Sequence, residues 1–228
     1  QASHITPALL ARDPHNVLLA RGPRFRLDAE IIRDSLLSVS GLLSQKIGGP
    51  SVFPPQPDSV SNEGAFARFE WRVSSGEDRY RRGLYTFMKR TTPYAMSGAF
   101  DAPTGESCVA QREVSNSPLQ ALMMLNDPVV IECAQALGVK ATQAAGDDVT
   151  RVSFLVRRCL GRLPSAPESR RLIIFTEQQR LRLSINDEAS AQIAKPDPQI
   201  SRELTRERAV WTLVARALMN TDEFVSKE

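Results

Sequence analysis

The chain has 228 residues, 42% of them hydrophobic, so it can bury a sizeable core as one large domain or two small ones. Its 29 Lys and Arg residues against 26 Asp and Glu residues give a formal charge of +3, far from the concentrated positive charge of a nucleic-acid-binding protein. No stretch approaches the roughly 18 apolar residues of a membrane span. We therefore expect neither a nucleic-acid partner nor a membrane span, and the opening Gln1 indicates a processed chain or an excised piece of a longer one.

Residues that bind metals or cofactors are scarce. The three cysteines, Cys108, Cys133 and Cys159, are widely separated and odd in number, so no disulfide framework is implied. The two histidines, His4 and His15, lie in one short N-terminal stretch, and no CxxC or HExxH spacing occurs. The sequence therefore predicts no cofactor, no haem and no metal site in this chain.

The first clear predicted element is an amphipathic helix from about Arg26 to Ser44. Its apolar residues recur at the three- and four-residue spacing of one helical face: Leu27, Ile31, Ile32, Leu36, Val39 and Leu43. The sequence Gly48-Gly49-Pro50 ends this pattern, because glycine and proline both disfavour helix. The proline-rich sequence SVFPPQPDSV that follows favours extended chain.

Aromatic and β-branched residues are frequent between Ala65 and Met88, in the segments FARFEWRV and RGLYTFM. A Ser-Ser-Gly turn separates the two segments, and their composition is typical of short strands. In a strand, alternate side chains lie on opposite faces, so Arg81 and Arg82 would point to opposite sides. The sequence therefore predicts two short strands in the middle of the chain.

Helix start signals are clearest in the second half. Ser117 with Gln120, and Ser165 with Glu168, each match a capping box, in which two side chains satisfy N–H groups that the start of a helix leaves free. In both cases a proline occupies the first helical turn. The two boxes predict helices that start near residues 118 and 166, the second of which continues to about residue 183.

Further segments complete the predicted architecture. Asp127 caps a segment that runs to Leu137 and can join the preceding helix as one kinked helix. An apolar stripe predicts a helix over residues 148–160, and another predicts a last helix over residues 202–219. Residues 184–201 are polar and contain two prolines, which is typical of a linker or long loop.

These elements predict a mainly α fold, an irregular helical domain with a small β element in the middle of the chain. We expect a main domain over residues 1–183, with the proline-rich loop and the short strands. The linker or long loop over residues 184–201 follows it. A C-terminal helix within residues 202–228 then packs back on the main domain.

Four long blocks carry a resemblance to a known family. In order they are RFRLDAEIIRDSLLSVSGLLSQKIGGPSVFPPQP, DRYRRGLYTFMKRTTP, FDAPTGESCVAQREVSNSPLQALMMLND and VARALMNTDEF. Together they resemble the C-terminal domain of unknown function of large planctomycete proteins that also carry a cytochrome c-like module. The resemblance implies an extracytoplasmic location, periplasmic or at the cell surface, and partners among the other domains of a parent protein, including that module. This chain has no CxxCH motif, so any haem would belong to another module.

The sequence FDAPTGESC, from Phe100 to Cys108, sets two carboxylates and a thiol around a turn. In a catalytic interpretation, Asp101 and Glu106 act as general acid and base, Cys108 is the nucleophile and Arg112 binds an anion. No histidine lies nearby in the sequence to activate the thiol. We favour a structural interpretation, in which Asp101 accepts hydrogen bonds from the downstream backbone and Cys108 packs as a small apolar group.

A basic stretch, RYRRGLYTFMKR, contains no acid. Its cationic residues are Arg79, Arg81, Arg82, Lys89 and Arg90. Such a patch can bind an acidic polysaccharide or the haem propionates of a partner, since arginine pairs well with carboxylates and sulfates. The alternative, which we favour, is ion pairing with acidic neighbours such as Glu77, Asp78 and Asp101.

Two classes of function stay open. The first is a non-catalytic scaffold or interaction domain of an exported multidomain protein, associated with cytochrome c-like redox modules or with polysaccharide processing. The second is a polysaccharide hydrolase or lyase with a site around Asp101, Glu106 and the stretch from Arg79 to Arg90. A deep pocket in which these polar groups converge would favour the enzyme, and a flat surface the scaffold.

Overall fold

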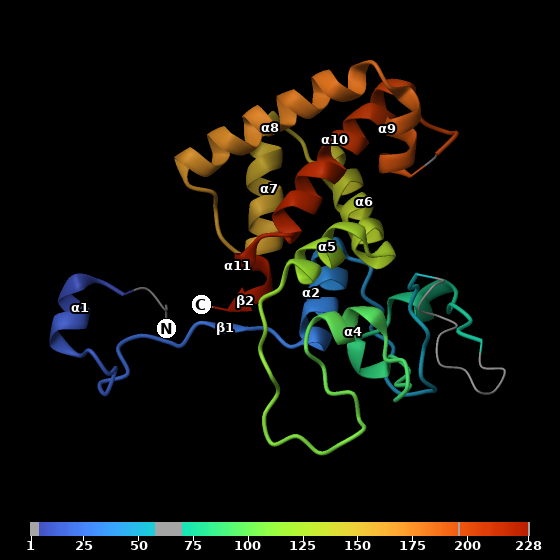
Figure 1. The fold of residues 1–228 in the computed structure, drawn as a ribbon. Helices are drawn as coiled ribbons and strands as arrows, with labels where there is room; N and C mark the ends of the chain where they lie inside the picture. Colours follow the sequence, from blue (N-terminus) through green and yellow to red (C-terminus); the bar gives the residue numbers. More distant parts are fainter. Residues whose placement is uncertain (1–4, 58–69, 196, 228) are drawn as a thin grey trace.

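The computed structural model describes residues 5–57, 70–195 and 197–227 of the chain. Figure 1 shows a mainly α fold with a small two-stranded sheet, which confirms the predicted fold class. The elements of the described residues are α1 Pro7–Arg12, β1 Phe25–Arg26, α2 Ala29–Ser40, the 3₁₀ turns η1 Gly76–Tyr80 and η2 Gly83–Tyr85, α4 Ala95–Ala99, α5 Pro118–Asn126, α6 Pro128–Gln143, α7 Asp148–Leu160, α8 Ala166–Ser184, α9 Asp187–Ala194, α10 Arg202–Met219, α11 Asp222–Val225 and β2 Ser226–Lys227.

Helix α10 is the centre of the helical part. It packs most closely along α6 and also contacts α7, α8 and α9, and it buries Trp211 completely. At the crossing with α6, a Cβ on Gly138 would lie only 2.8 Å from the carbonyl oxygen of Arg208 and 2.9 Å from the backbone nitrogen of Thr212. Glycine at this position therefore allows the two helix backbones to approach closely.

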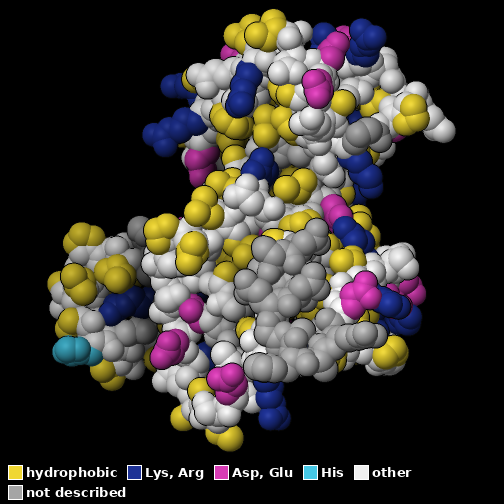
Figure 2. Space-filling model, turned by 45° about the vertical axis from the view of Figure 1, so that its right-hand side comes forward, with side chains coloured by type: hydrophobic (Ala, Val, Ile, Leu, Met, Phe, Trp, Pro, Cys, Tyr) yellow, Lys and Arg dark blue, Asp and Glu magenta, His cyan; other side chains and the backbone are white. Residues whose placement is uncertain are grey.

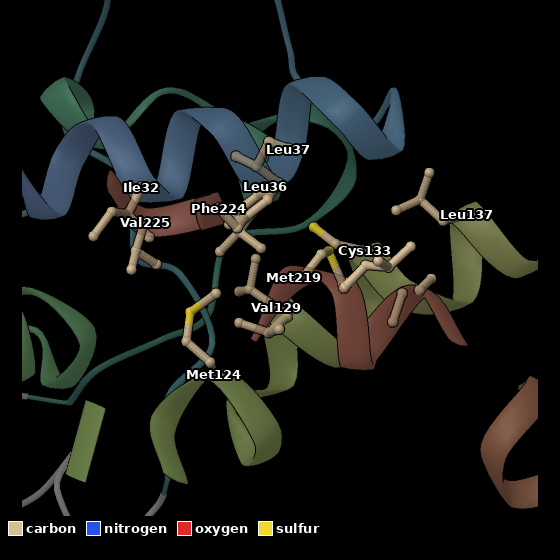
Figure 3. Packing of buried hydrophobic residues seen from close by; sticks show 14 of the residues in the cluster. Ile32, Leu36, Leu37, Met124, Val129, Cys133, Leu137, Met219, Phe224 and Val225 are labelled. Atoms are coloured by element: carbon tan, nitrogen blue, oxygen red, sulfur yellow. The ribbon is translucent and has the colours of Figure 1, made fainter. Parts of the chain in front are cut away.

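A second group of contacts joins α2 to this centre. Figure 3 shows Ile32, Leu36 and Leu37 of α2 facing apolar side chains of α5, α6, α10 and α11. Cys133 of α6 and Phe224 of α11 lie in the same buried cluster. One hydrophobic core thus connects elements from both halves of the chain.

The predicted helix starts are confirmed. The backbone N–H of Ser117 donates to Oε1 of Gln120 at 3.2 Å, and that of Ser165 donates to Oε2 of Glu168 at 2.8 Å, as a capping box requires. Asp127 accepts from the backbone N–H groups of the two residues at 129 and 130, at 2.8 and 3.3 Å. The helices before and after Asp127 are bent by 56°, so this cap starts a separate helix rather than a kink.

The two strands predicted between residues 65 and 88 are not found in residues 70–88, and residues 65–69 lie outside the described part. The 3₁₀ turns η1 and η2 occupy this stretch, with one isolated bridge from Thr86 to Val52. Arg81 and Arg82 do point to opposite sides, because Arg81 is buried and donates to backbone carbonyls while Arg82 is exposed, but the backbone around them forms turns and not a strand. The prediction was wrong because this stretch wraps around a buried cation instead of pairing with a neighbouring strand.

Residues 187–194 form α9 where the sequence predicted a linker or long loop. The side chain of Asn186 caps this helix by accepting from the backbone N–H of Ala189 at 2.9 Å. Ser190 and Ala194 are buried, and the helix packs on α10. The last predicted helix, residues 202–219, is confirmed as α10.

The small sheet joins distant parts of the chain. In it, β1 pairs antiparallel with β2, with Phe25 opposite Lys227 and Arg26 opposite Ser226. Before β1, residues 5–22 form an arm that lies beside the body, and α1 within it has no buried residue. Figure 2 shows hydrophobic side chains gathered on this arm, the most exposed being Val17, Leu18 and Leu19.

By length and hydropathy, none of the helices in the described part of the chain can cross a membrane alone. The bent pair of α5 and α6 meets the same criterion when its two members are taken together.

Candidate functional site

Asp101 closes the base of the loop that begins with FDAPTGESC. One carboxylate oxygen accepts from the backbone N–H of Ser115 at 2.8 Å, and the Ser115 hydroxyl donates to both carboxylate oxygens at 2.8 and 2.9 Å. Asp101 has a positive φ of 60°, a conformation that aspartate tolerates better than most residues. Its neighbour Phe100 is buried in the core, so the loop is held at the point where it leaves the body.

Glu106 and Cys108 lie in the exposed part of this loop, which projects from the body in Figure 1. The prediction that Cys108 packs as a small apolar group is wrong, because the thiol is exposed. Because Asp101 ties the loop at its base, residues 104–111 lie outside the core and are exposed. By contrast, Cys133 is buried, and burial raises the pKa of its thiol to about 12.

Three arginines of the basic stretch bind other groups of the same chain: Arg79, Arg81 and Arg82. Arg79 donates to Glu132, with 3.1 Å between Nε and Oε2, and this hydrogen bond raises the pKa of Arg79. Arg82 donates to Asp34, with 2.7 Å between Nε and Oδ2. These acids lie on α6 and α2 and are not the predicted neighbours in the sequence. The acids that follow Gly76 bind Lys46 instead: Glu77 and Asp78.

Arg81 is buried and has carbonyl partners. It donates to the backbone oxygens of Lys46 at 3.3 Å and of Pro50 at 3.2 Å, and also to that of Gly48. Its guanidinium carbon lies 3.7 Å from the ring centroid of Tyr85, a cation–π geometry. Arg81 therefore shapes the chain around residues 46–50 and does not face solvent.

Arg112 and Arg90 complete the predicted anion-binding set, and they lie apart. Arg112 makes a two-pronged contact with Glu30, with 2.7 Å from Nη1 to Oε2 and 3.2 Å from Nη2 to Oε1. Arg90 is exposed, and its side chain passes close to Gly105 of the FDAPTGESC loop, where a Cβ would lie 3.9 Å from the Arg90 Cγ. Asp101, Glu106 and Cys108 line none of five prominent hollows in the described part of the chain.

The largest of those hollows, about 770 Å³, runs beside α2 and carries apolar residues such as Ile31 and Leu160. All but one of its charged lining residues form ion pairs within the chain, the exception being Lys227 at the C-terminal end of the described residues. Arg82 on its wall binds Asp34, and Glu223 on its wall binds Arg162. We therefore do not place the candidate site there, although this hollow is the larger one.

A smaller polar pocket of about 330 Å³ lies directly behind Asp101, and we call it the Arg26 pocket. Its walls are residues 24 and 26 beside β1, Phe100, residues 116–124 around the start of α5, and residues 220–225 around α11. Gln120 lines it and donates from Nε2 to the Ser115 hydroxyl at 3.1 Å and to Asp101 at 3.5 Å. Asp101, which the sequence suggested as a candidate site residue, does not line this pocket itself. It contacts Gln120, which does.

Arg26 is the central cation of the pocket. It donates from Nη1 to the backbone oxygen of Ser115, and its guanidinium lies 5.4 Å from the ring centroid of Phe100. Its buried Nε has no hydrogen-bond partner, and no carboxylate among the described residues forms an ion pair with it. The neighbouring Arg24, by contrast, binds Asp222.

Sequence reasoning missed this pocket. The available signal was the RFR sequence of residues 24–26, two cations separated by one residue at the start of the predicted helix. What the sequence could not show is the pairing of β1 with β2, since strands of two residues carry no readable pattern. That pairing brings Asn220 and Asp222 to the same pocket.

The pocket contains hydrogen-bonding groups, one ion pair and a further cation, above an apolar floor. No histidine and no cysteine line it. Within the described ranges, no three His, Cys, Asp or Glu side chains gather in a way that could hold a metal ion. The arrangement suits the binding of a small polar group, and it lacks a nucleophile paired with a base.

Comparison with known proteins gives one match. The model of a family described as PSD1, protein of unknown function (DUF1553), matches residues 1–176. None of the curated proteins matches the chain, and no solved structure matches it. Three of the four sequence blocks quoted above, those that begin at Arg24 and Phe100 and the closing one, meet at the Arg26 pocket.

Proposed function

We propose that this chain, which belongs to the PSD1 family of proteins of unknown function, acts as a non-catalytic interaction domain. The observation that carries the proposal is the pairing of its charged side chains. Arg79, Arg82 and Arg112 each bind a carboxylate of a distant segment, and Asp101 is engaged by its own loop. These pairings stabilise one geometry of the chain. An arginine does not transfer protons at neutral pH, and the one carboxylate of the set that could do so, that of Asp101, is held by Ser115.

The setting that we propose is an exported multidomain protein of the planctomycete type. Its partners are the other domains of that parent, including a cytochrome c-like module, and the haem resides there. Association with polysaccharide processing belongs to the same proposal. The support for this setting is the resemblance of the four sequence blocks, and the location that follows from it is extracytoplasmic, in the periplasm or at the cell surface.

The alternative enzyme, a hydrolase or lyase around Asp101 and Glu106, has less support. Glu106 is exposed on the projecting loop, whereas Asp101 lies at its base and binds Ser115. A hydrolase needs two carboxyl groups at a fixed separation on either side of the scissile bond. An exposed loop residue and a loop-closing residue do not provide this arrangement.

The proposal is tested by a search for turnover. The full chain is incubated with neutral and acidic polysaccharides, and reducing ends and unsaturated products are measured alongside the variants Asp101→Asn and Glu106→Gln. We expect no product above the background of heat-denatured protein. Product formation that both variants abolish would establish the enzyme and overturn the proposal.

A further inference from the structure

We propose that the Arg26 pocket binds a carboxylated sugar ring, a hexuronate unit of an acidic polysaccharide. This inference rests on the proposed function, because it names what the interaction domain holds. The sequence suggested the Arg79 to Arg90 stretch for such a ligand. With the exception of the exposed Arg90, the arginines of that stretch are engaged within the chain.

The charge of the pocket favours a ligand with one negative charge. Two arginines, Arg24 and Arg26, and one carboxylate, Asp222, line it, which leaves one positive charge among its lining residues. Arg24 and Asp222 bind each other, so the remaining charge belongs to Arg26. A phosphate ester carries about 1.5 to 2 negative charges at neutral pH and would be only partly neutralised.

The chemistry of Arg26 favours a carboxylate. A guanidinium has five N–H donors in a planar fork, and the described structure uses one of its groups, Nη1, on the Ser115 carbonyl. The guanidinium also lies over the Phe100 ring, in a cation–π contact that helps to hold it in the pocket. A planar carboxylate is the group that pairs with such a fork through parallel hydrogen bonds.

The remaining walls suit the hydroxyls and the apolar face of a sugar. Asn116 and Asn220 line the pocket, and neither side-chain amide has a hydrogen-bond partner in the described structure. Each amide offers both donors and an acceptor to a hydroxyl. Met124 and Val225 supply an apolar surface on the same pocket. One ligand unit can thus meet a cation, two amides and an apolar wall.

The size of the pocket is consistent with one ring. Small-molecule sites usually span about 300 to 1,000 Å³, and 330 Å³ lies at the lower end of that range. The pocket is open to solvent, so a bound unit need not be a free monosaccharide. We infer that it holds one unit of a chain and not a long oligosaccharide.

The test is calorimetric titration of the full chain with trigalacturonate at low and high salt. The matched probes are fully methyl-esterified trigalacturonate, the neutral trisaccharide maltotriose, and acetate as a carboxylate without a sugar. We expect binding of the acid, weakened by salt, and no measurable binding of the ester or of maltotriose. Acetate that binds as tightly as trigalacturonate, or an ester that binds as well as the acid, would overturn the inference.

Variants locate the site. Arg26→Gln is expected to weaken binding about tenfold or more, since it removes charge-assisted hydrogen bonds. Asn220→Ala should weaken it less. Arg90→Gln, which changes an exposed arginine outside the pocket, should leave it unchanged. If Arg26→Gln fails to fold, the binding of trigalacturonate by Asn220→Ala tests the site instead. Binding that is unaltered in every variant that folds would exclude this pocket.

The two proposals fail separately. Absence of binding together with absence of turnover removes the hexuronate inference and leaves the interaction domain. Cleavage of trigalacturonate removes the non-catalytic proposal, whatever the affinity.

Discussion

Asp101 shows how one side chain can organise a long loop. Its carboxylate binds both the N–H and the hydroxyl of Ser115, fourteen residues further along the chain. The same Ser115 supplies its carbonyl to Arg26 and its hydroxyl oxygen to Gln120. The loop base and the pocket wall therefore share one small hydrogen-bond network, and a change at Asp101 is transmitted to both.

We predict that Asp101→Ala lowers the stability of the fold by about 1 to 2 kcal/mol. The change leaves the Ser115 N–H without its acceptor, and alanine tolerates the positive φ less well than aspartate does. Asp101→Asn keeps an acceptor and should lose less. Thermal unfolding followed by circular dichroism measures both, with Glu106→Ala as the exposed control. Equal midpoints for Asp101→Ala and Glu106→Ala would rule out this role.

For single residues, the sequence predicted the kind of interaction that a side chain makes better than it predicted which residue the side chain binds. It suggested that Asp101 binds the downstream backbone, and the Ser115 contact is of that kind. It also suggested ion pairs for the basic stretch, but Arg79 binds Glu132, 53 residues away, and not an adjacent acid. Long side chains pair with whatever acid the fold brings near, and sequence distance does not encode that choice.

At the scale of elements, local rules identified the long helices and failed for the short elements. A capping box such as that of Ser165 and Glu168 acts within one helical turn, so it can be read from the sequence. The turns η1 and η2 form around the buried Arg81, and α9 is stabilised by its packing on α10. Elements of this length depend on tertiary contacts, which override the preferences of their own residues.

Arg162 connects two elements that are distant in the sequence. It binds Glu168 in the first turn of α8, with 2.6 Å from Nη2 to Oε1, and Glu223 of α11, with 2.7 Å from Nε to Oε1. The hydrogen bonds from Arg162, and then those from Ser165, lower the pKa of Glu168 to about 2. The start of α8 is thereby linked to one wall of the Arg26 pocket.

This linkage predicts acid sensitivity. A carboxyl whose pKa is lower in the folded than in the unfolded chain stabilises the fold above its ordinary pKa, and that contribution is lost as pH falls toward the folded value. For Glu168 the window runs from its ordinary 4.5 down to about 2. Between pH 7 and pH 3, the unfolding midpoint of the wild-type chain should fall more than that of Arg162→Gln.

The matched control for this experiment is Arg170→Gln, which removes an exposed arginine from α8, the helix whose first turn Arg162 contacts. Its midpoint should follow the wild-type pH dependence. If Arg162→Gln shows the same fall as the wild-type chain and this control, the Arg162 fork does not stabilise the fold.

At the scale of the whole molecule, the fold extends beyond the part that the family model matches. That match covers residues 1–176, whereas α10 begins at Arg202 and lies against α6 in the core. Trp211 is fully buried there. The Arg26 pocket also needs residues 220–225 for one of its walls. The residues after 176 are thus part of the same folding unit.

We predict that a chain shortened to residues 1–184 loses cooperative unfolding. Without α10, the face of α6 around Leu137 and Gly138 would be exposed to water. Removal of residues 1–21 should have little effect, because α1 buries no residue. Melting curves by circular dichroism and calorimetry compare the two shortened chains with the full one. A sharp transition for residues 1–184 near the full-length midpoint would contradict the prediction.

The pairing of β1 with β2 also sets an order of events during synthesis. Arg26 and Ser226, opposite each other in the sheet, are made roughly 200 residues apart. At about 5 to 20 residues per second, the ribosome needs about 10 to 40 s to deliver the second partner. Throughout that interval β1 has no strand to pair with, and closing so long a loop adds an entropic barrier. The nascent chain therefore cannot present the Arg26 pocket, and a ligand of that pocket can act on the finished fold but cannot guide its early steps.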